Sequence, residues 1–311
     1  MEIKVLKSFF QKQRLSLTHL EKLEKIGIKN VEQLIALSKE NLVYLLGVSE
    51  DTAERILKAG WRAYRPVFQT AFEIRDEEEK IGKMETPLKR LNEVLGGGFE
   101  FGSLIEFFGP YASGKSQFLF TQSVLEASKG SFVMFIDTEM TLRYDRLKQI
   151  AISRGFNEDA LEKILIKKAP SSSELILLVH HLLSLIPKLR ENGKRVSLIV
   201  IDSLLNPFRA DYIGISELAV RQQKLNWCLR TLLNIAKANE LVVMYSNQVV
   251  GSPSSPFGWI PAGGHVLGHA STIRFSLHRR GTKRIIRIED APHLPKIDVW
   301  FKISEKGVED V

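Results

Sequence analysis

The chain has 311 residues, which is long enough for about two domains. Hydrophobic residues make up 44% and charged residues 26%, so the composition is globular and excludes a wholly disordered chain. The net charge of +8 permits binding to a polyanion without proving it. The single cysteine, Cys228, excludes an intrachain disulfide and a cysteine-rich zinc site. With neither a signal-peptide pattern nor an apolar run of about 18 residues, we expect a cytoplasmic protein, not secreted and not in a membrane.

Residues 1–65 are predicted to form a small domain of short helices. Apolar residues recur there at helical spacing, Gly47 is a typical helix stop, and Ser49 is a good N-cap for a helix from Glu50 to Ala59. Short helices joined by glycine-containing turns suggest a helix-hairpin-helix-like bundle. In such a bundle, backbone N–H groups at a helix N-terminus can hold a DNA phosphate. A helical bundle that contacts proteins remains the alternative.

Residues 66–85 form the predicted linker. They contain three basic and six acidic residues, including the acidic run from Asp76 to Glu79. Such a run is typical of a solvated helix face or connector. We therefore expect it to separate the helical domain from a core domain at 86–311.

The core is predicted to be an α/β domain. Apolar strand patterns alternate with helical patterns, which is typical of a mostly parallel sheet with helices on both faces. The expected strands are 104–108, 132–136, 198–201 and 241–246, and the expected helices are 116–127, 174–190 and 217–239. Three later patterns, at 272–278, 284–289 and 299–303, lie too close together for intervening helices, so they predict antiparallel strands at one edge.

A phosphate-binding loop is the strongest chemical signal. It has the pattern G-x-x-x-x-G-K-[ST] between a predicted strand and a predicted helix, and it consists of Gly109, Pro110, Tyr111, Ala112, Ser113, Gly114, Lys115 and Ser116. Its glycines let backbone N–H groups close around phosphate oxygens. Lys115 would reach the β- and γ-phosphates, and the Ser116 hydroxyl would bind Mg²⁺. The sequence thus predicts ATP and Mg²⁺ as cofactors.

Three polar residues follow predicted strands whose carboxyl ends should meet at the same sheet edge. Asp202 follows the apolar run 198–201, and we expect it to position Mg²⁺ through water. Glu139 is the candidate that activates the attacking water. A helix N-cap role for Asp137 or Thr138 is the alternative interpretation of this segment. Gln248 is the candidate that senses the γ-phosphate and passes the signal to the following loop. For Gln248, ordinary hydrogen bonding at a strand end is the alternative.

At this point the chain resembles the RecA/RadA family of homologous-recombination ATPases, in its archaeal and eukaryotic branch. The resemblance covers nearly the whole length. It is carried by Leu95–Gly98, the phosphate loop with Gln117, Asp137–Glu139 with Arg143 and Arg146, Asp202–Ser203, Phe208–Tyr212, Arg221–Leu225, Asn247–Val249, Gly263–His265 and Asp290–Pro295. It implies a RecA-type ATPase core and a DNA-dependent ATPase that binds single- and double-stranded DNA, and it places the protein at the nucleoid.

The resemblance also implies roles for individual residues. Gln117 belongs to the nucleotide site, Arg146 would lie against the adenine, and Asp290 and Pro295 would cap the ATP of a neighbouring subunit. Phe68 and Ala71 match a Phe-x-x-Ala polymerisation motif that plugs into the next protomer of a filament or ring. Packing of this linker onto the chain's own core is the alternative. The residues assigned to DNA binding are Arg209, Arg221, Phe257, Trp259 and Gly264; the two aromatic residues could instead pack against a partner protein.

Departures from the family pattern leave two functions open. After Tyr212-Ile213-Gly214 the expected arginine is missing, and the second loop, 250–262, has neither lysine nor arginine. The stretch expected to form the socket for Phe68 reads Lys167-Lys168-Ala169. One hypothesis is a filament-forming recombinase that performs strand exchange. The other is a paralogue that binds ATP and a related recombinase, with weak strand exchange of its own.

Basic residues cluster near the predicted antiparallel edge. They are Arg274, His278, Arg279, Arg280, Lys283, Arg284 and Arg287. A solvated hairpin and a surface that binds duplex or single-stranded DNA are both open interpretations.

Overall fold

A computed structural model of the chain describes residues 7–11, 16–25, 28, 30–66, 68–253, 255 and 257–311. By its internal contacts the chain divides into two compact units. The first comprises Met1–Ile81 with Leu178–Gly193, and the second comprises Gly82–Leu177 with Lys194–Val311.

The first unit contains the predicted short helices. They are α2 (Leu17–Lys25), α3 (Val31–Ile35), α4 (Lys39–Leu46) and α5 (Glu50–Ala63), followed by α6 (Ala71–Glu78). Gly47 ends α4 in the left-handed conformation at φ 68°, and the Ser49 hydroxyl accepts a hydrogen bond from the Thr52 amide, as the sequence predicts. Helices α2 to α5 share one apolar core, in which Leu23, Leu34 and Ile56 are fully buried. Helix α5 runs four residues beyond its predicted end.

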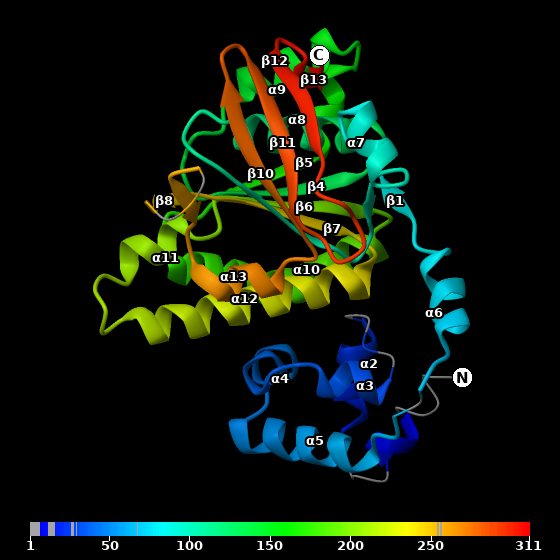
Figure 1. Cartoon of the computed structure of the whole chain (residues 1–311). Coiled ribbons are helices and arrows are strands. Elements are labelled where there is room, and N and C mark those ends of the chain that lie inside the picture. Colours follow the sequence, from blue (N-terminus) through cyan, green and yellow to red (C-terminus); the bar gives the residue numbers. More distant parts are fainter. Residues whose placement is uncertain are drawn as a thin grey trace. The chain divides into compact units, whose positions relative to one another are not determined.

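A sheet of nine strands forms the second unit, within the part of the chain that the structure describes (Figure 1). In spatial order the strands are β13 (Gly307–Asp310), β12 (Asp298–Ser304), β11 (Lys283–Asp290), β10 (Ile273–Arg280), β3 (Leu104–Phe108), β7 (Val242–Asn247), β6 (Val196–Asp202), β4 (Phe132–Asp137) and β5 (Ile164–Lys168). The pairs from β10 to β5 are parallel, and those from β10 to β13 are antiparallel. The predicted α/β fold with antiparallel edge strands is therefore confirmed.

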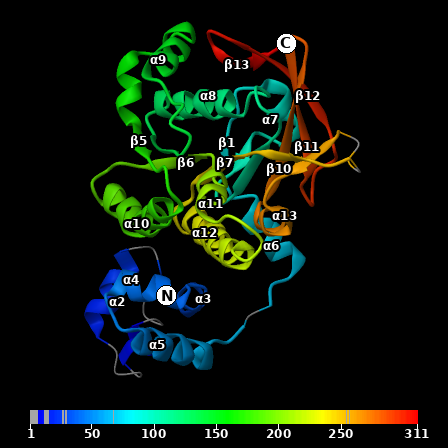
Figure 2. The same cartoon turned by 90° about the vertical axis from the view of Figure 1, so that its left-hand side faces the viewer.

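Helices cover both faces of this sheet. Helices α8 (Lys115–Ser128) and α9 (Tyr144–Ser153) lie on one face, and α11 (Asn206–Asp211), α12 (Leu218–Asn239) and α13 (Gly264–Ala270) lie on the other (Figures 1 and 2). Every residue of β3, β6 and β7 is buried, because helices cover both faces of these parallel strands, and most of the residues are apolar. The shorter elements are α7 (Lys89–Val94), the 3₁₀ helix η1 (Glu158–Lys163), and two strand pairs, β1 (Lys83–Met84) with β2 (Phe99–Glu100) and β8 (Val249–Gly251) with β9 (Trp259–Pro261).

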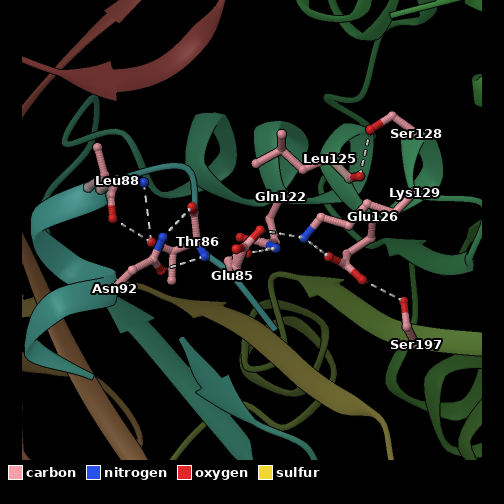
Figure 3. A network of polar contacts seen from close by, with 10 residues as sticks. All are labelled: Glu85, Thr86, Leu88, Asn92, Gln122, Leu125, Glu126, Ser128, Lys129 and Ser197. Atoms are coloured by element: carbon pink, nitrogen blue, oxygen red, sulfur yellow. Dashed lines mark hydrogen bonds and ion pairs between the residues drawn. The ribbon is translucent and has the colours of Figure 1, made fainter. Parts of the chain in front are cut away.

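Polar contacts fix the C-terminal half of α8 (Figure 3). The Gln122 side chain donates to the Glu85 carbonyl at 2.9 Å, and the buried Glu126 carboxylate accepts from the Ser197 hydroxyl at 2.9 Å. Lys129 pairs with both Glu85 and Glu126. The helix that begins at the phosphate loop is thereby tied to β6 and to the segment that follows β1.

Helix α10 (Ser172–Glu191) is the one helix in the described ranges that is long and apolar enough to cross a membrane. A third of its most apolar window is buried within the protein, and Pro187 lies inside it. A single helix of this kind is a weak indication of a membrane span, since core helices of soluble proteins meet the same criterion.

Candidate functional site: a phosphate loop at the edge of the parallel sheet

The phosphate loop joins β3 to α8, in the context that the motif requires. Ala112 and Gly114 have positive φ angles of 60° and 109°. A Cβ atom on Gly109 would lie 2.4 Å from the Leu277 carbonyl oxygen of β10, so only glycine fits there. The Lys115 amine donates to the carbonyls of Gly109 at 2.8 Å and Pro110 at 3.0 Å. The Lys115 side chain therefore folds back over the first two residues of the loop.

The three predicted polar residues do meet at this sheet edge. Glu139 follows β4, Asp202 ends β6 and Gln248 follows β7, and all three line one cavity with the loop. The Gln248 amide donates to the Glu139 carboxylate at 3.2 Å. The cavity has a volume of about 680 Å³. Its lining residues are Gly109, Tyr111, Ala112, Gly114, Lys115, Ser116, Gln117, Phe120, Glu139, Thr141, Asp202, Gln248, Val249, Arg284 and Ile303.

The charges of the cavity suit a metal–phosphate complex. Burial raises the pKa of Asp202, and the hydroxyls of Ser246 and Ser116 oppose that rise. The second carboxylate oxygen of Asp202 is buried without a hydrogen-bond partner in the described residues. Burial lowers the pKa of Lys115, while Asp202 and Glu139 oppose the change.

These residues fit Mg²⁺ held mainly by phosphate oxygens. In the described residues, no three His, Cys, Asp or Glu side chains are close enough to hold a metal ion by themselves. Mg²⁺ usually keeps several waters and binds through one or two protein ligands plus substrate phosphates. The Ser116 hydroxyl and the free oxygen of Asp202 match that requirement.

The loop that contains Glu139 is fixed from two sides. The buried Asp137 carboxylate accepts hydrogen bonds from the backbone amides of Thr141 and Leu142. The Thr138 hydroxyl donates to the Ser203 carbonyl at 2.7 Å, so the loop is also held against the end of β6. Asp137 is not a helix N-cap, because the next helix, α9, begins at Tyr144 and its N-cap is Arg143. The hydrogen bonds of Asp137 instead hold the loop that places Glu139 beside the cavity.

Arg146 lies next to Gln117 of the cavity. Its Nε atom donates to the Gln117 side chain at 2.8 Å, and its guanidinium also donates to the Ser304 carbonyl at 2.7 Å. These contacts hold a planar cation beside the first turn of α8. Contact between Arg146 and an adenine stays a prediction.

Asp290 and Pro295 lie away from the cavity of their own chain. Both are exposed, and neither belongs to the cavity lining. Asp290 ends β11 and pairs with Arg274 of β10. Arg274 pairs in turn with Glu106 of β3, and Glu106 lies two residues before the end of that strand. The segment after Asp290 is therefore not at the sheet edge that holds the phosphate loop.

Phe68 and Ala71 are exposed at the start of α6. Phe68 is 94% exposed, which is extreme for an aromatic side chain. The Thr70 hydroxyl and the Glu73 carboxylate form a capping box at the same place, so the helix start is well defined.

The first predicted DNA-binding loop connects α11 to α12. Arg209 is exposed on α11, whereas the Nε atom of Arg221 on α12 is buried without a hydrogen-bond partner among the described residues. At the tip of the loop, the side chain of Ile213 is 78% exposed and that of Ile215 is 92% exposed. Apolar side chains thus stand where the family pattern has a cation.

The second loop begins and ends in the β8–β9 pair. Phe257 stacks on Trp259, and both rings contact the His278 ring of β10, at 4.8 Å and 5.2 Å. The Arg287 guanidinium lies over Phe257. Both aromatic residues predicted to stack on bases therefore pack on their own chain. Gly264 begins α13 after the tight turn at Gly263.

One buried side chain holds both ends of this loop. The Asn247 amide donates to the Glu106 carboxylate at 2.7 Å and to the Ala262 carbonyl at 2.8 Å. Glu106 is itself paired with Arg274 at 2.6 Å; burial raises the pKa of Glu106, and Arg274 opposes that rise. Neighbouring Gln248 accepts from the Ala262 amide through its carbonyl at 2.9 Å.

The predicted basic cluster divides into paired and unpaired members. Arg274 is paired with Glu106, and Arg287 is paired with Asp298. The cations at the β10–β11 turn are Arg279, Arg280, Lys283 and Arg284, and they have no acidic partner in the part of the chain that the structure describes. Arg284 and Ile303 also line the cavity. The sequence did not indicate this, because both residues lie on strands that are distant in the chain from the phosphate loop.

This fold and site define a phosphate-loop nucleotide-binding protein with a RecA-type core. Comparison with known proteins agrees. The family model described as Rad51 matches residues 77–311. The DNA repair and recombination protein RadA of Ignicoccus hospitalis is 37% identical over 304 residues, which cover 93% of this chain and 91% of that protein. The chain therefore belongs to the Rad51/RadA branch of the RecA/RadA family.

Proposed function

We propose that this protein is a DNA-dependent ATPase of DNA recombination and repair. The observation that carries the proposal is the single cavity in which the phosphate loop, Asp202, Glu139 and Gln248 meet. The RadA relative, named for DNA repair and recombination, supports the DNA setting.

The geometry supports a direct route to ATP hydrolysis. The loop amides and Lys115 bind the phosphates, and Mg²⁺, when bound by Ser116 and Asp202, neutralises phosphate charge. Glu139 accepts a proton from the water that attacks the γ-phosphate. Gln248, hydrogen-bonded to Glu139, responds to the γ-phosphate and is directly connected to the second loop.

We further propose that ATP lies between protomers of a filament or ring. Asp290 and Pro295 are exposed and away from their own cavity, as residues must be if they cap the ATP of a neighbour. Phe68 is an exposed anchor suited to a socket on another protomer.

Phe68→Ala is therefore expected to reduce oligomer size, because it removes the aromatic plug. Light scattering on the purified protein with ATP measures the size distribution. Phe72→Ala is the matched control, since Phe72 is 71% exposed on the same segment but lies outside the motif. An unchanged distribution for Phe68→Ala would show that the motif is only structural.

A second candidate function, an accessory paralogue, is favoured by the DNA-binding loops. The expected arginine after Gly214 is missing, exposed Ile215 follows Gly214 instead, and Phe257 and Trp259 are packed against His278. Fewer phosphate contacts weaken binding to single-stranded DNA and flatten its dependence on salt. Lys167 and Lys168, in the proposed socket, are exposed at the end of edge strand β5.

The deciding experiment is strand exchange by the purified protein alone, with ATP, Mg²⁺ and homologous single- and double-stranded DNA. A recombinase gives robust exchange that Lys115→Ala abolishes. Tight binding to a separate recombinase without exchange would instead establish the paralogue. Absence of DNA-stimulated ATP hydrolysis would reject the DNA-dependent ATPase.

A further inference from the structure

Arg284 brings a cation into the nucleotide cavity from the antiparallel half of the sheet. It lies on β11, near the turn to β10, and lines the cavity with Gly114 and Gln117. Its Cδ atom would lie 3.2 Å from a Cβ atom placed on Gly114, so its side chain runs directly along the phosphate loop.

The charge of Arg284 lacks a balancing anion. Its Nε atom is buried without a hydrogen-bond partner in the described residues, and one terminal nitrogen donates to the Thr282 carbonyl at 3.2 Å. Across the strand pair it faces Arg279, and like charges in this position are destabilising. Burial and Arg279 both lower the pKa of Arg284. A bound anion would supply the missing partner.

Lys115 and Arg284 are placed in different electrostatic surroundings. Asp202 and Glu139 act on the pKa of Lys115, whereas the charge that acts on Arg284 is that of Arg279. In phosphate-loop proteins the lysine reaches the β- and γ-phosphates, and the loop amides hold the α- and β-phosphates. Arg284 runs along Gly114 of this loop, and the α-phosphate is the phosphate there that the lysine does not reach.

We propose that Arg284 is a nucleotide-binding residue that contacts the α-phosphate of the bound nucleotide. This inference rests on the ATP site of the proposed function. Since ATP and ADP share the α-phosphate, Arg284 strengthens the binding of both to the same degree. Gln248, which faces the γ-phosphate, discriminates between them.

The test compares dissociation constants for Mg·ATP and Mg·ADP by calorimetric titration of the full-length protein. We expect Arg284→Gln to raise both constants about 10- to 100-fold, by the same factor, because it removes a charge-assisted hydrogen bond. Arg284→Lys keeps the charge and is expected to lose less. Lys302→Gln is the matched control, because Lys302 is an exposed cation of neighbouring β12 that pairs with Glu309 outside the cavity.

Two results would overturn the inference: unchanged constants in Arg284→Gln, or a loss confined to ATP. If thermal melting shows that Arg284→Gln does not fold, Arg284→Lys carries the test: a smaller loss that is equal for ATP and ADP supports the inference, and a loss confined to one nucleotide overturns it. Failure of the unaltered protein to bind either nucleotide would overturn the proposed function itself.

Discussion

Lys115→Ala is expected to lose ATP turnover, by at least about 100-fold in kcat. Lys115 stabilises charge on the transferred phosphoryl group, and removing one such positioned donor costs about 10²–10³ in rate. Its amine is held by the carbonyls of Gly109 and Pro110, and the loop contains no second lysine that could replace it. The measurement is steady-state release of phosphate from ATP with Mg²⁺.

Lys129→Ala is the matched control for this experiment. Lys129 follows the last turn of the same helix and pairs with Glu85 and Glu126, away from the cavity. Hydrolysis at the normal rate in Lys115→Ala would reject the assignment of the phosphate loop.

Glu139→Gln is expected to separate ATP binding from ATP hydrolysis. The amide keeps the size of the side chain and an oxygen that can accept from Gln248, but it cannot take a proton from water. Hydrolysis should fall about 10²–10⁴-fold, the usual contribution of general base catalysis. Binding of Mg·ATP should stay within a few-fold of the unaltered protein.

Single-turnover hydrolysis combined with titration of ATP distinguishes these two effects. Glu93→Gln serves as the control, since Glu93 pairs with Arg90 on the surface. A parallel loss of binding and hydrolysis in Glu139→Gln would show that Glu139 holds the nucleotide and does not activate water.

The parallel half of the sheet could be predicted because its signals are local. Strands β3, β4, β6 and β7 are short apolar runs, and the residues that follow them must meet at one edge. That rule placed Glu139, Asp202 and Gln248 together without any contact information. The phosphate loop was equally local, since eight consecutive residues contain it.

The other parts of the sheet and of the cavity lining depend on contacts between segments that are distant in the sequence. Strand β5 has only Ile164 buried, so the alternation that marks a strand is absent. Arg284 and Ile303 enter the cavity because β10 pairs with β3, and the pattern of β11 and β12 does not contain this information. In the same way, Phe257 and Trp259 pack on His278 because of where β10 places that ring, and the sequence alone does not give the pairing of β10 with its neighbours.

The double hydrogen bond of Asn247 has a mechanical consequence. Asn247 holds the carbonyl of Ala262, and adjacent Gln248 holds the amide of the same residue. The entry and the exit of the second loop are thus joined into one block, which Glu106 attaches to the strand before the phosphate loop. Under the proposed function, a displacement of Gln248 toward the γ-phosphate would move both ends of the loop in the same direction, so we expect the loop to be reoriented as a whole.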